Sequence, residues 1–321
     1  MKCLYCGKEI KANAMNSELE NRWHKSCVKK FFGIPDMPLL EISPDLLNKL
    51  ARETINKGFT VPGVQKKLSL HLSTEKESRL TIVDYPTGYI LKPQTDEYSN
   101  LPEFENLAMQ MAKVTGIKIV PQALIKCNNE YAYITKRIDR ELDNSHNVQM
   151  FAMEDFCQLS ERITADKYKG SYEKCGKIIS KYSSMPGLDL TEFYTRVVFS
   201  FIIGNSDMHL KNFSLIETAP KSRIFTLAPA YDMLPVNIIL PEDTEEMALT
   251  LNGKKRRLKK QDFISLSKSC NINEKATEKI ISKICNLKDI YFNICDNSYL
   301  PKEYNNQVKA LIDLRVQILQ E

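Results

Sequence analysis

The chain has 321 residues, of which 43% are hydrophobic and 26% charged, the composition of an ordinary globular protein long enough for two lobes and a small appendage. No apolar run reaches transmembrane length and no apolar leader follows Met1, so we expect a cytoplasmic protein without a membrane partner. Nine cysteines without a dense framework indicate reduced thiols. The formal net charge of +5 permits direct contact with nucleic acid without requiring it.

The first 36 residues are predicted to form a small head that binds a metal ion. Cys3 and Cys6 are followed by His24 and Cys27, and this C-x2-C and H-x2-C spacing suits a tetrahedral zinc ion. The head has few apolar residues, so the bound metal would supply its folding free energy. The alternative is an exposed dithiol beside a surface histidine. The other six cysteines have no ligand spacing and are expected to be small buried residues.

Residues 37–138 are predicted to form a small lobe that mixes strands with helices. A serine cap and a proline at the first helical position indicate a short helix up to Gly58. Short, partly alternating stretches predict strands, and apolar residues at helical spacing before Gly116 predict a second helix. The strands are expected at 67–72, 80–83, 89–91, 123–126 and 131–134, and the second helix at 101–115.

Two segments of this lobe are candidates for binding phosphate groups. The turn Thr60-Val61-Pro62-Gly63-Val64-Gln65-Lys66-Lys67 offers backbone donors and lysines, although a turn with a single glycine also fits an ordinary basic hairpin. Lys92 ends an apolar strand, where protein kinases place the lysine that pairs with nucleotide phosphates. Glu105, on the amphipathic helix that follows, is a candidate partner for this lysine, and Glu103 is the competing one.

Residues 139–321 are predicted to be mainly helical around one catalytic hairpin. An apolar helix at 193–203 runs into the polar loop Gly204-Asn205-Ser206-Asp207-Met208-His209-Leu210-Lys211-Asn212-Phe213. Protein kinases carry an Asp and an Asn at the same five-residue separation, where the Asp accepts the proton of the substrate hydroxyl and the Asn binds magnesium. An ordinary turn or helix cap is the alternative, but a buried helix that ends in Asp, His, Lys and Asn indicates a site.

A second acidic residue is expected close to this loop. The stretches 213–216 and 224–227 alternate and predict a short hairpin that carries Asp232 back toward the loop. Asn212 and Asp232 would then lie side by side as magnesium ligands. The sequence therefore predicts an enzyme that transfers a phosphoryl group.

The order of these motifs resembles that of the HipA family of bacterial serine/threonine kinase toxins. The resemblance extends from about Phe59 to the C-terminus, and its strongest element is the Asp-x-His-x-Lys-Asn order of the catalytic loop. The matching segments are Thr60 to Lys67, Arg137-Ile138-Asp139-Arg140, Glu154-Asp155, Lys167-Tyr168, residues 204–213 and Tyr231-Asp232.

The resemblance implies an α+β, two-lobed, protein-kinase-like fold that holds ATP between its lobes. It implies that Asp207 is the catalytic base and that Asn212 and Asp232 bind Mg²⁺. Lys92, held by Glu105, would grip phosphate oxygens. The remaining nucleotide-binding residues by resemblance are Pro62, Gly63, Val64, Gln65, Lys66 and Lys67 in the loop above the nucleotide, Lys136, Arg137 and Ile138 at the hinge, His209 and Lys211 at the phosphate end, and Tyr231 beside Asp232.

The resemblance also implies a cellular role. Members of the family commonly carry a serine at the start of the phosphate loop whose autophosphorylation silences the kinase; here Thr60 takes that place and Pro62 restricts the loop. The additional N-terminal subdomain of longer members is not evident, so we expect the short, HipT-like form. The implied substrate is a protein, with an aminoacyl-tRNA synthetase as the target class. The implied partners are small antitoxin proteins, such as a DNA-binding helix-turn-helix protein.

Two other functions remain as alternatives. A small-molecule phosphotransferase, acting on an aminoglycoside, choline or a sugar, uses a similar loop, and an inactive kinase fold could serve as a scaffold. A dense basic block from Lys254 to Lys260 follows the turn Asn252-Gly253 and is either a solvated face or a docking site for an acidic target or nucleic acid. The amphipathic stretch between Val308 and Leu319 is expected to pack into the core.

Overall fold

The computed structural model describes residues 1–40, 67–73, 78–82, 88–127, 129–142 and 148–321. The chain divides into two compact units. The first comprises Met1–Asn106 and Pro121–Arg140, and the second comprises Leu107–Val120 and Glu141–Glu321. The predicted helix before Gly58 lies outside the described residues.

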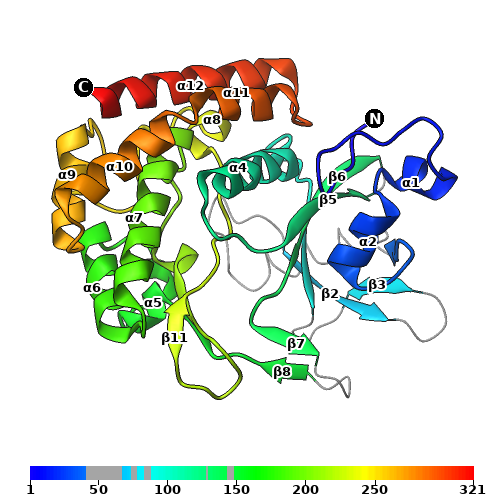
Figure 1. Ribbon diagram of the computed structural model, residues 1–321, viewed down its shortest axis with the longest axis horizontal. Coiled ribbons are helices and arrows are strands. Elements are labelled where there is room, and N and C mark those ends of the chain that lie inside the picture. Colours follow the sequence, from blue (N-terminus) through cyan, green and yellow to red (C-terminus); the bar gives the residue numbers. More distant parts are fainter. Residues whose placement is uncertain (41–66, 74–77, 83–87, 128, 143–147) are drawn as a thin grey trace. The chain divides into compact units, whose positions relative to one another are not determined.

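A six-stranded sheet with the order β1-β3-β2-β4-β6-β5 is the framework of the first unit (Figure 1). Neighbouring strands are antiparallel except β1 and β3, which are parallel. The bounds are β1 Leu39–Leu40, β2 Leu68–Ser73, β3 Arg79–Ile82, β4 Tyr89–Pro93, β5 Gln122–Cys127 and β6 Glu130–Lys136. The five predicted strands are present, and the paired residues Leu91 and Ile134 are fully buried in the middle of the sheet.

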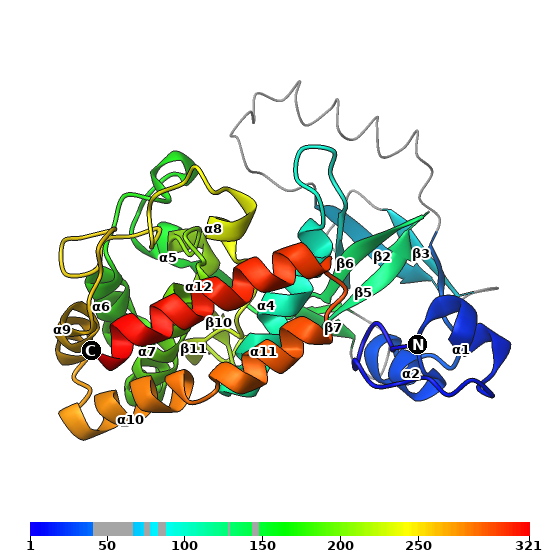
Figure 2. The ribbon, with the colours of Figure 1, turned by 90° about the horizontal axis from the view of Figure 1, so that it is seen from above.

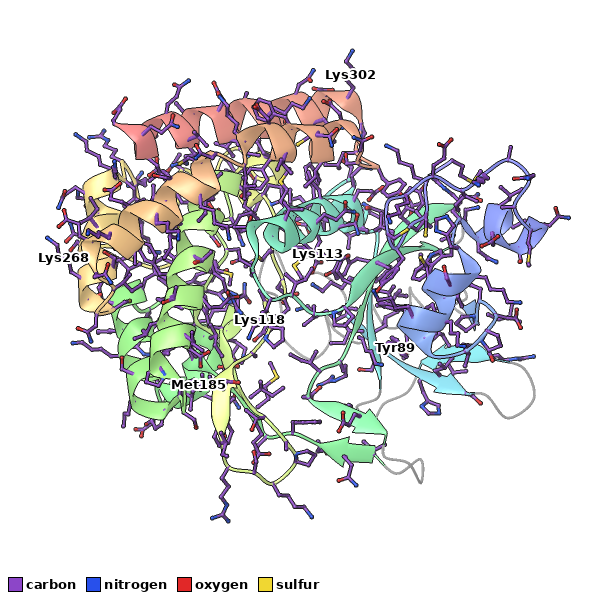
Figure 3. All side chains as sticks on the ribbon, in the orientation of Figure 1. Tyr89, Lys113, Lys118, Met185, Lys268 and Lys302 are labelled. Carbon is purple, nitrogen blue, oxygen red and sulfur yellow. The ribbon has the colours of Figure 1, made fainter. Side chains whose placement is uncertain are left out.

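The N-terminal head packs on this sheet within the first unit. It contains helices α1 (Asn16–Asn21) and α2 (Lys25–Phe32). The backbone N–H of Leu124 on β5 donates to the carbonyl of Leu4 at 3.2 Å, and the indole N–H of Trp23 donates to the carbonyl of Leu124 at 3.1 Å. A cluster of aromatic rings with centroids 4.8–5.8 Å apart joins the two parts, and it consists of Tyr5, Trp23, Phe31, Phe32 and Tyr89. Tyr89, labelled in Figure 3, is the contribution of strand β4 to this cluster.

Helix α4 (Leu101–Thr115) has the bounds predicted from its apolar spacing. The five apolar residues on which that prediction rests are each at most 1% exposed, and they are Phe104, Leu107, Ala108, Met111 and Ala112. The helix ends at Gly116, whose φ of +94° lies in the left-handed region that glycine adopts without strain. Helix α4 begins in the first unit and ends in the second.

The second unit is mainly helical, as predicted, and contains a three-stranded sheet with the order β11-β10-β9. Its helices are α5 Phe156–Leu159, α6 Tyr172–Tyr182, α7 Pro186–Ile203, α8 Val236–Ile239, α9 Lys260–Ser269, α10 Glu274–Cys285, α11 Lys288–Asp296 and α12 Lys302–Gln320, with two 3-10 turns, η1 Thr164–Asp166 and η2 Leu210–Asn212. Its strands are β8 Val148–Met150, β9 Met153–Asp155, β10 Ser214–Glu217 and β11 Phe225–Leu227, and β7 Arg140–Leu142, which pairs with β8, starts at the last residue of the first unit. Figure 2 shows α12 alongside α11.

Helix α7 is the centre of the second unit. It begins at Pro186, earlier than predicted, because proline suits the first position of a helix and Met185, labelled in Figure 3, precedes it as the N-cap. From Val197 to Ile203 no residue is more than 1% exposed, and helices α6, α10 and α12 pack against α7. Among the described residues, none of the helices combines the length and the apolar character that crossing a membrane requires.

Three of the six basic residues in the block pair with acidic residues of the same unit. Nζ of Lys254 lies 2.8 Å from Oδ1 of Asp262, and Nζ of Lys255 lies 2.9 Å from Oε2 of Glu245. Nζ of Lys260 lies 3.6 Å from Glu278. For these three lysines the contacts favour a surface that is satisfied within the protein.

Most of the expected core residues of the C-terminal stretch are buried, whereas Leu311 and Ile318 are half-buried. In α12 the four most buried apolar side chains are Val308, Ile312, Val316 and Leu319. The six cysteines without ligand spacing are also buried, and they are Cys127, Cys157, Cys175, Cys270, Cys285 and Cys295. All nine cysteines are free thiols.

Replacing Gly204 by alanine is expected to destabilise the protein by about 1–3 kcal/mol, because its φ of +71° strains any residue with a Cβ and the added methyl group would meet the side chain of Leu311. Urea unfolding of the purified variant measures the loss. Gly187→Ala is the control near the start of helix α7, the helix that Gly204 caps, because an added Cβ there meets nothing within 4 Å. That control should be unchanged or slightly more stable, and equal losses in both variants would contradict the role of Gly204.

Candidate functional site

The loop after helix α7 carries the predicted catalytic aspartate. Gly204 ends the helix in the left-handed conformation, and Asn205 and Ser206 are buried behind it. The side chain of Asp207 is 42% exposed, so the chain presents one carboxylate to solvent directly after a buried segment. The backbone N–H of Asp207 donates to the side-chain oxygen of Asn205 at 3.3 Å, which supports the turn at this point.

Asn212 closes the loop onto Asp207. It is the last residue of the 3-10 turn η2, and its side-chain Nδ2 donates to the backbone carbonyl of Asp207 at 2.9 Å. The carboxamide and the carboxylate that are five positions apart in sequence therefore belong to one closed turn. This arrangement gives both side chains a defined position before any ligand binds.

Strand β11 leads to Asp232 and is held by two charged residues buried on α7. A carboxylate oxygen of Asp189 accepts the backbone N–H of Leu227 at 2.7 Å, and the guanidinium of Arg196 donates to the carbonyl of Ala228 at 2.8 Å. Asp232 has a φ of 55°, in the left-handed region that non-glycine residues seldom adopt. Such backbone conformations are concentrated at functional sites.

The charges of Asp207 and Asp232 both affect the pKa of His209. Its Nε2 is 3.9 Å from Oδ1 of Asp207, and its side chain is buried. Burial lowers the pKa of the imidazole to about 4, although the negative charges of Asp207 and Asp232 both act to raise it. The imidazole is therefore neutral at neutral pH, and the two carboxylates are near enough to act on the same ring.

Lys211, assigned to the phosphate end by resemblance, and Tyr231, assigned to the place beside Asp232, are both engaged within the protein. Nζ of Lys211 lies 2.6 Å from Oδ2 of Asp155, the N-cap of α5. The hydroxyl of Tyr231 donates to the carbonyl of Lys211 at 3.1 Å and shares a hydrogen bond with the hydroxyl of Ser214. Lys211 and Tyr231 thus hold the turn of residues 207–212 and the hairpin together.

Tyr168 is a site residue that the sequence analysis did not assign. Its phenol donates to Oδ1 of Asp207 at 2.5 Å. The motif Lys167-Tyr168 is one of the segments that resemble the family, but no sequence pattern connects it with a carboxylate 39 positions later. Only the folded chain brings the two groups together.

In the first unit, Lys92 is paired with Glu105 rather than with Glu103. Nζ of Lys92 lies 2.6 Å from Oε1 of Glu105, and both side chains are at most 3% exposed. A buried lysine without a counter-charge would be costly, so this pair fixes the lysine in the sheet. The carboxylate of Glu103 instead accepts the side-chain N–H of Asn100 at 3.1 Å.

The other nucleotide-binding candidates of the first unit are described only in part. Thr60 and the loop residues Pro62, Gly63, Val64, Gln65 and Lys66 lie outside the described residues, and Lys67 is exposed just before β2. Among the hinge candidates, Lys136 ends β6 with an exposed side chain, and Ile138 is half-buried. The guanidinium of Arg137 donates to both carboxylate oxygens of Asp139, at 2.9 and 2.7 Å, so it supports the turn that leaves the sheet.

The four metal-ligand candidates of the head converge. One ligand atom each from Cys3, Cys6, His24 and Cys27 can be chosen so that all four lie within 4.8 Å of one another. Nδ1 of His24 is 3.4 Å from Sγ of Cys6 and 3.7 Å from Sγ of Cys27. Ligands about 2.0–2.3 Å from a tetrahedral zinc ion are separated by about 3.5–4 Å, so these two distances need little adjustment.

The second ring nitrogen of His24 supports the same interpretation. Nε2 lies 3.2 Å from the carbonyl oxygen of Glu9, so a proton on Nε2 leaves Nδ1 as the free acceptor toward the thiols. Metal-binding histidines typically donate their other N–H to a carbonyl or a carboxylate in this way. The residues present therefore fit a structural metal ion. The dithiol alternative placed His24 on the surface without a role, and the observed cluster disfavours it.

Comparison with known proteins gives a family and a fold. The family model of the HipA-like C-terminal domain matches residues 59–289. "Putative kinase Y4dM" of Sinorhizobium fredii is 33% identical over 234 residues, which cover 68% of this chain and 55% of the relative. A "Putative kinase" of Haemophilus influenzae is 26% identical over 287 residues and 82% of each protein. The chain thus spans about half the length of Y4dM and most of the Haemophilus protein.

Two solved structures share the architecture. HipA of Shewanella oneidensis MR-1, determined with HipB and operator DNA of a toxin–antitoxin system, matches with a TM-score of 0.69 and 17% identity over 88% of this chain and 72% of HipA. The Helicobacter pylori proinflammatory kinase CtkA matches with a TM-score of 0.53 and 17% identity over 78% of this chain and 93% of CtkA. The predicted α+β, two-lobed, kinase-like fold is confirmed. The family match over most of the chain shows that this protein belongs to the HipA family, through its HipA-like C-terminal domain.

Proposed function

We propose that this protein is an ATP- and magnesium-dependent kinase that phosphorylates serine or threonine in another protein. The observation that carries the proposal is the closed turn in which the Asn212 carboxamide bonds to the Asp207 carbonyl while the Asp207 carboxylate stays accessible. Membership in the HipA family and relatives named as kinases support the same activity. In this proposal residues 1–36 form the metal-binding head, 37–138 the nucleotide lobe and 139–321 the catalytic lobe.

The donor set of the catalytic unit fits magnesium. A carboxylate from Asp232 and an amide oxygen from Asn212 are hard oxygen ligands of the kind that Mg²⁺ takes beside phosphate oxygens. When bound, the metal neutralises negative charge on the phosphates of ATP. Residues 60–67 are proposed as the loop over these phosphates, with Lys136 to Ile138 at the adenine.

Two residues of this chain, Asp207 and Lys92, would carry the transfer step, and His209 packs beside Asp207. Asp207 accepts the proton of the attacking hydroxyl and orients its oxygen toward the phosphorus. Lys92, fixed by Glu105, holds phosphate oxygens, because a lysine that is already paired and buried loses little freedom on binding them. His209, which is neutral at neutral pH, is not a cation for the phosphates and serves as packing beside Asp207.

We infer the cellular role from the structural similarity to HipA of Shewanella oneidensis. HipA of Shewanella oneidensis is described as part of a toxin–antitoxin system with HipB and operator DNA. By analogy we propose that this protein is a toxin, that a small DNA-binding antitoxin is its partner, and that its substrate is a translation component such as an aminoacyl-tRNA synthetase. Thr60 is the proposed site of self-phosphorylation.

Zinc is the proposed metal of the head. Three thiols and one imidazole are borderline-soft ligands, which distinguishes this centre from the oxygen ligands of the magnesium site. Because the aromatic cluster joins the head to strands β4 and β5, the metal would stabilise the sheet as well as the head.

The Asp207→Asn variant is expected to lose at least about 100-fold in phosphoryl transfer, because a positioned base contributes about 10²–10⁴-fold. Labelled ATP, magnesium and a cell lysate measure the transfer, and wild-type protein should label a discrete polypeptide. Asp289→Asn is the control, since Asp289 is exposed at the start of α11.

Three outcomes would contradict this proposal. Full activity in Asp207→Asn would show that Asp207 is not the catalytic base. Label that appears only in small molecules would indicate a small-molecule phosphotransferase. A scaffold without activity would show neither labelling nor a rise in melting temperature with ATP and magnesium. The rise should survive Asp207→Asn, because Asp207 is not a ligand of the nucleotide.

Zinc analysis of the purified protein is expected to give about one ion per chain, and Cys27→Ser should lose it because three ligands hold zinc less tightly than four. A zinc chelator should lower the melting temperature of the wild type and leave that of Cys27→Ser unchanged. Cys127→Ser is the matched control, since Cys27 and Cys127 are both 8% exposed in the same unit. Equal zinc content in both variants would exclude Cys27 as a ligand.

The pH dependence of stability is expected to report the buried His209. Its pKa is about 4 in the folded protein and about 6.5 when unfolded, so between these values only the unfolded chain binds the proton. Stability is therefore constant with respect to this group above about pH 6.5 and falls as the pH drops toward 4, by about 3 kcal/mol in total. Urea unfolding at pH 4.5 and 7 should show a smaller difference in His209→Gln than in the wild type, and an equal difference would contradict the assignment.

A further inference from the structure

Tyr168 meets the catalytic aspartate in the second unit. The residue follows the 3-10 turn η1 and precedes helix α6. The carbonyl of its neighbour Lys167 accepts the backbone N–H of Leu210 at 3.1 Å. The segment that carries Tyr168 is thus attached to the catalytic turn through the backbone, independently of the tyrosine side chain.

The ring of Tyr168 is held from two sides. It lies edge-on to the imidazole of His209 with centroids 5.1 Å apart, and Nζ of Lys167 lies 4.9 Å from its centroid. The side chain still retains 40% exposure, which is similar to that of Asp207. The ring therefore reaches the accessible carboxylate with a restricted orientation, and its hydroxyl is not free to leave without breaking these contacts.

The hydrogen bond engages one of the two carboxylate oxygens. The phenol of Tyr168 donates to Oδ1 of Asp207 at 2.5 Å, which is short for an O–H···O contact and typical of a bond to a charged acceptor. Among the residues that the structure describes, none donates a hydrogen bond to Oδ2. A base needs one oxygen for the incoming hydroxyl, and Oδ2 remains available for it.

The phenol acts as a donor throughout the physiological range. Burial, followed by the charge of Asp207, raises the pKa of Tyr168 well above its usual value. The hydroxyl therefore keeps its proton and cannot compete with Asp207 as a base. The negative charges of Asp243 and Glu245 also raise this pKa.

We propose that Tyr168 is a positioning residue, which fixes the catalytic carboxylate through Oδ1 so that Oδ2 is presented to the substrate hydroxyl. The proposal rests on the proposed kinase function. It differs from a blocking role, in which the phenol would occupy the place of the substrate and its removal would accelerate the reaction. The two roles predict opposite changes in rate.

The test is Tyr168→Phe, which removes the hydroxyl and keeps the ring contacts with His209 and Lys167. Phosphoryl transfer to the lysate polypeptide that wild-type protein labels should show a kcat about 10-fold or more lower, because hydrogen bonds to charged groups are among the stronger ones. The KM for ATP and the melting temperature should stay unchanged. A structural role alone would instead lower the melting temperature and leave kcat in place.

Tyr182→Phe is the matched control. Tyr182 is also 40% exposed in the same unit, and Nζ of Lys181 lies 4.6 Å from its ring centroid. Its replacement should leave kcat unchanged. In the Asp207→Asn background, Tyr168→Phe should add little further loss, because the two side chains act as one unit.

The outcomes separate the two proposals. If wild-type protein labels a polypeptide in an Asp207-dependent way and Tyr168→Phe is as fast or faster, the positioning role is overturned while the kinase function stands. If wild-type protein transfers no phosphate to any acceptor, the proposed function fails, and the role of Tyr168 fails with it.

Discussion

The burial of helix α7 is the constraint on which the second unit and its candidate site depend. Because residues 197–203 are enclosed on all sides, the helix cannot rotate or extend without exposing core side chains to water. Gly204 turns the chain out of this core into the loop that bears Asp207. Two charged side chains buried on the same helix hold the strand that leads to Asp232. A single apolar helix thereby positions both acids, although it contributes no atom to the proposed chemistry.

The polar side chains around Asp207 are mostly bonded to side-chain or backbone groups of the same unit. Lys211 is held by Asp155, Tyr231 by the carbonyl of Lys211, and Asn212 by the carbonyl of Asp207. Because these groups already have a fixed orientation, they lose little further conformational entropy when a ligand binds. The resemblance to kinases assigned several of these residues to the nucleotide. Their contacts indicate that part of the motif maintains the turn and that fewer groups remain for the phosphates.

The head shows how a small module can be stabilised by two different means. Its thiols and imidazole converge where the chain has few apolar residues, and its aromatic rings pack on the sheet where apolar surface is available. Tyr89 joins this packing from strand β4, three positions before Lys92 on the same strand. The Cys/His cluster of the head and the strand that carries the lysine therefore lie in one packed unit.

The sequence by itself determined the features that depend on near neighbours: the bounds of α4, the five longer strands, the 207/212 spacing and the Cys/His ligand set. Periodicity and short motifs report such features because the interacting groups lie within a few residues of one another. Only the tertiary structure decided that Glu105 and not Glu103 pairs with Lys92, that β9 joins the catalytic hairpin, and that Tyr168 bonds to Asp207. Strand β9 covers only Met153–Asp155 and shows no clear alternation of apolar and polar residues. Contacts between distant segments follow from how helices and strands pack, which no local pattern encodes.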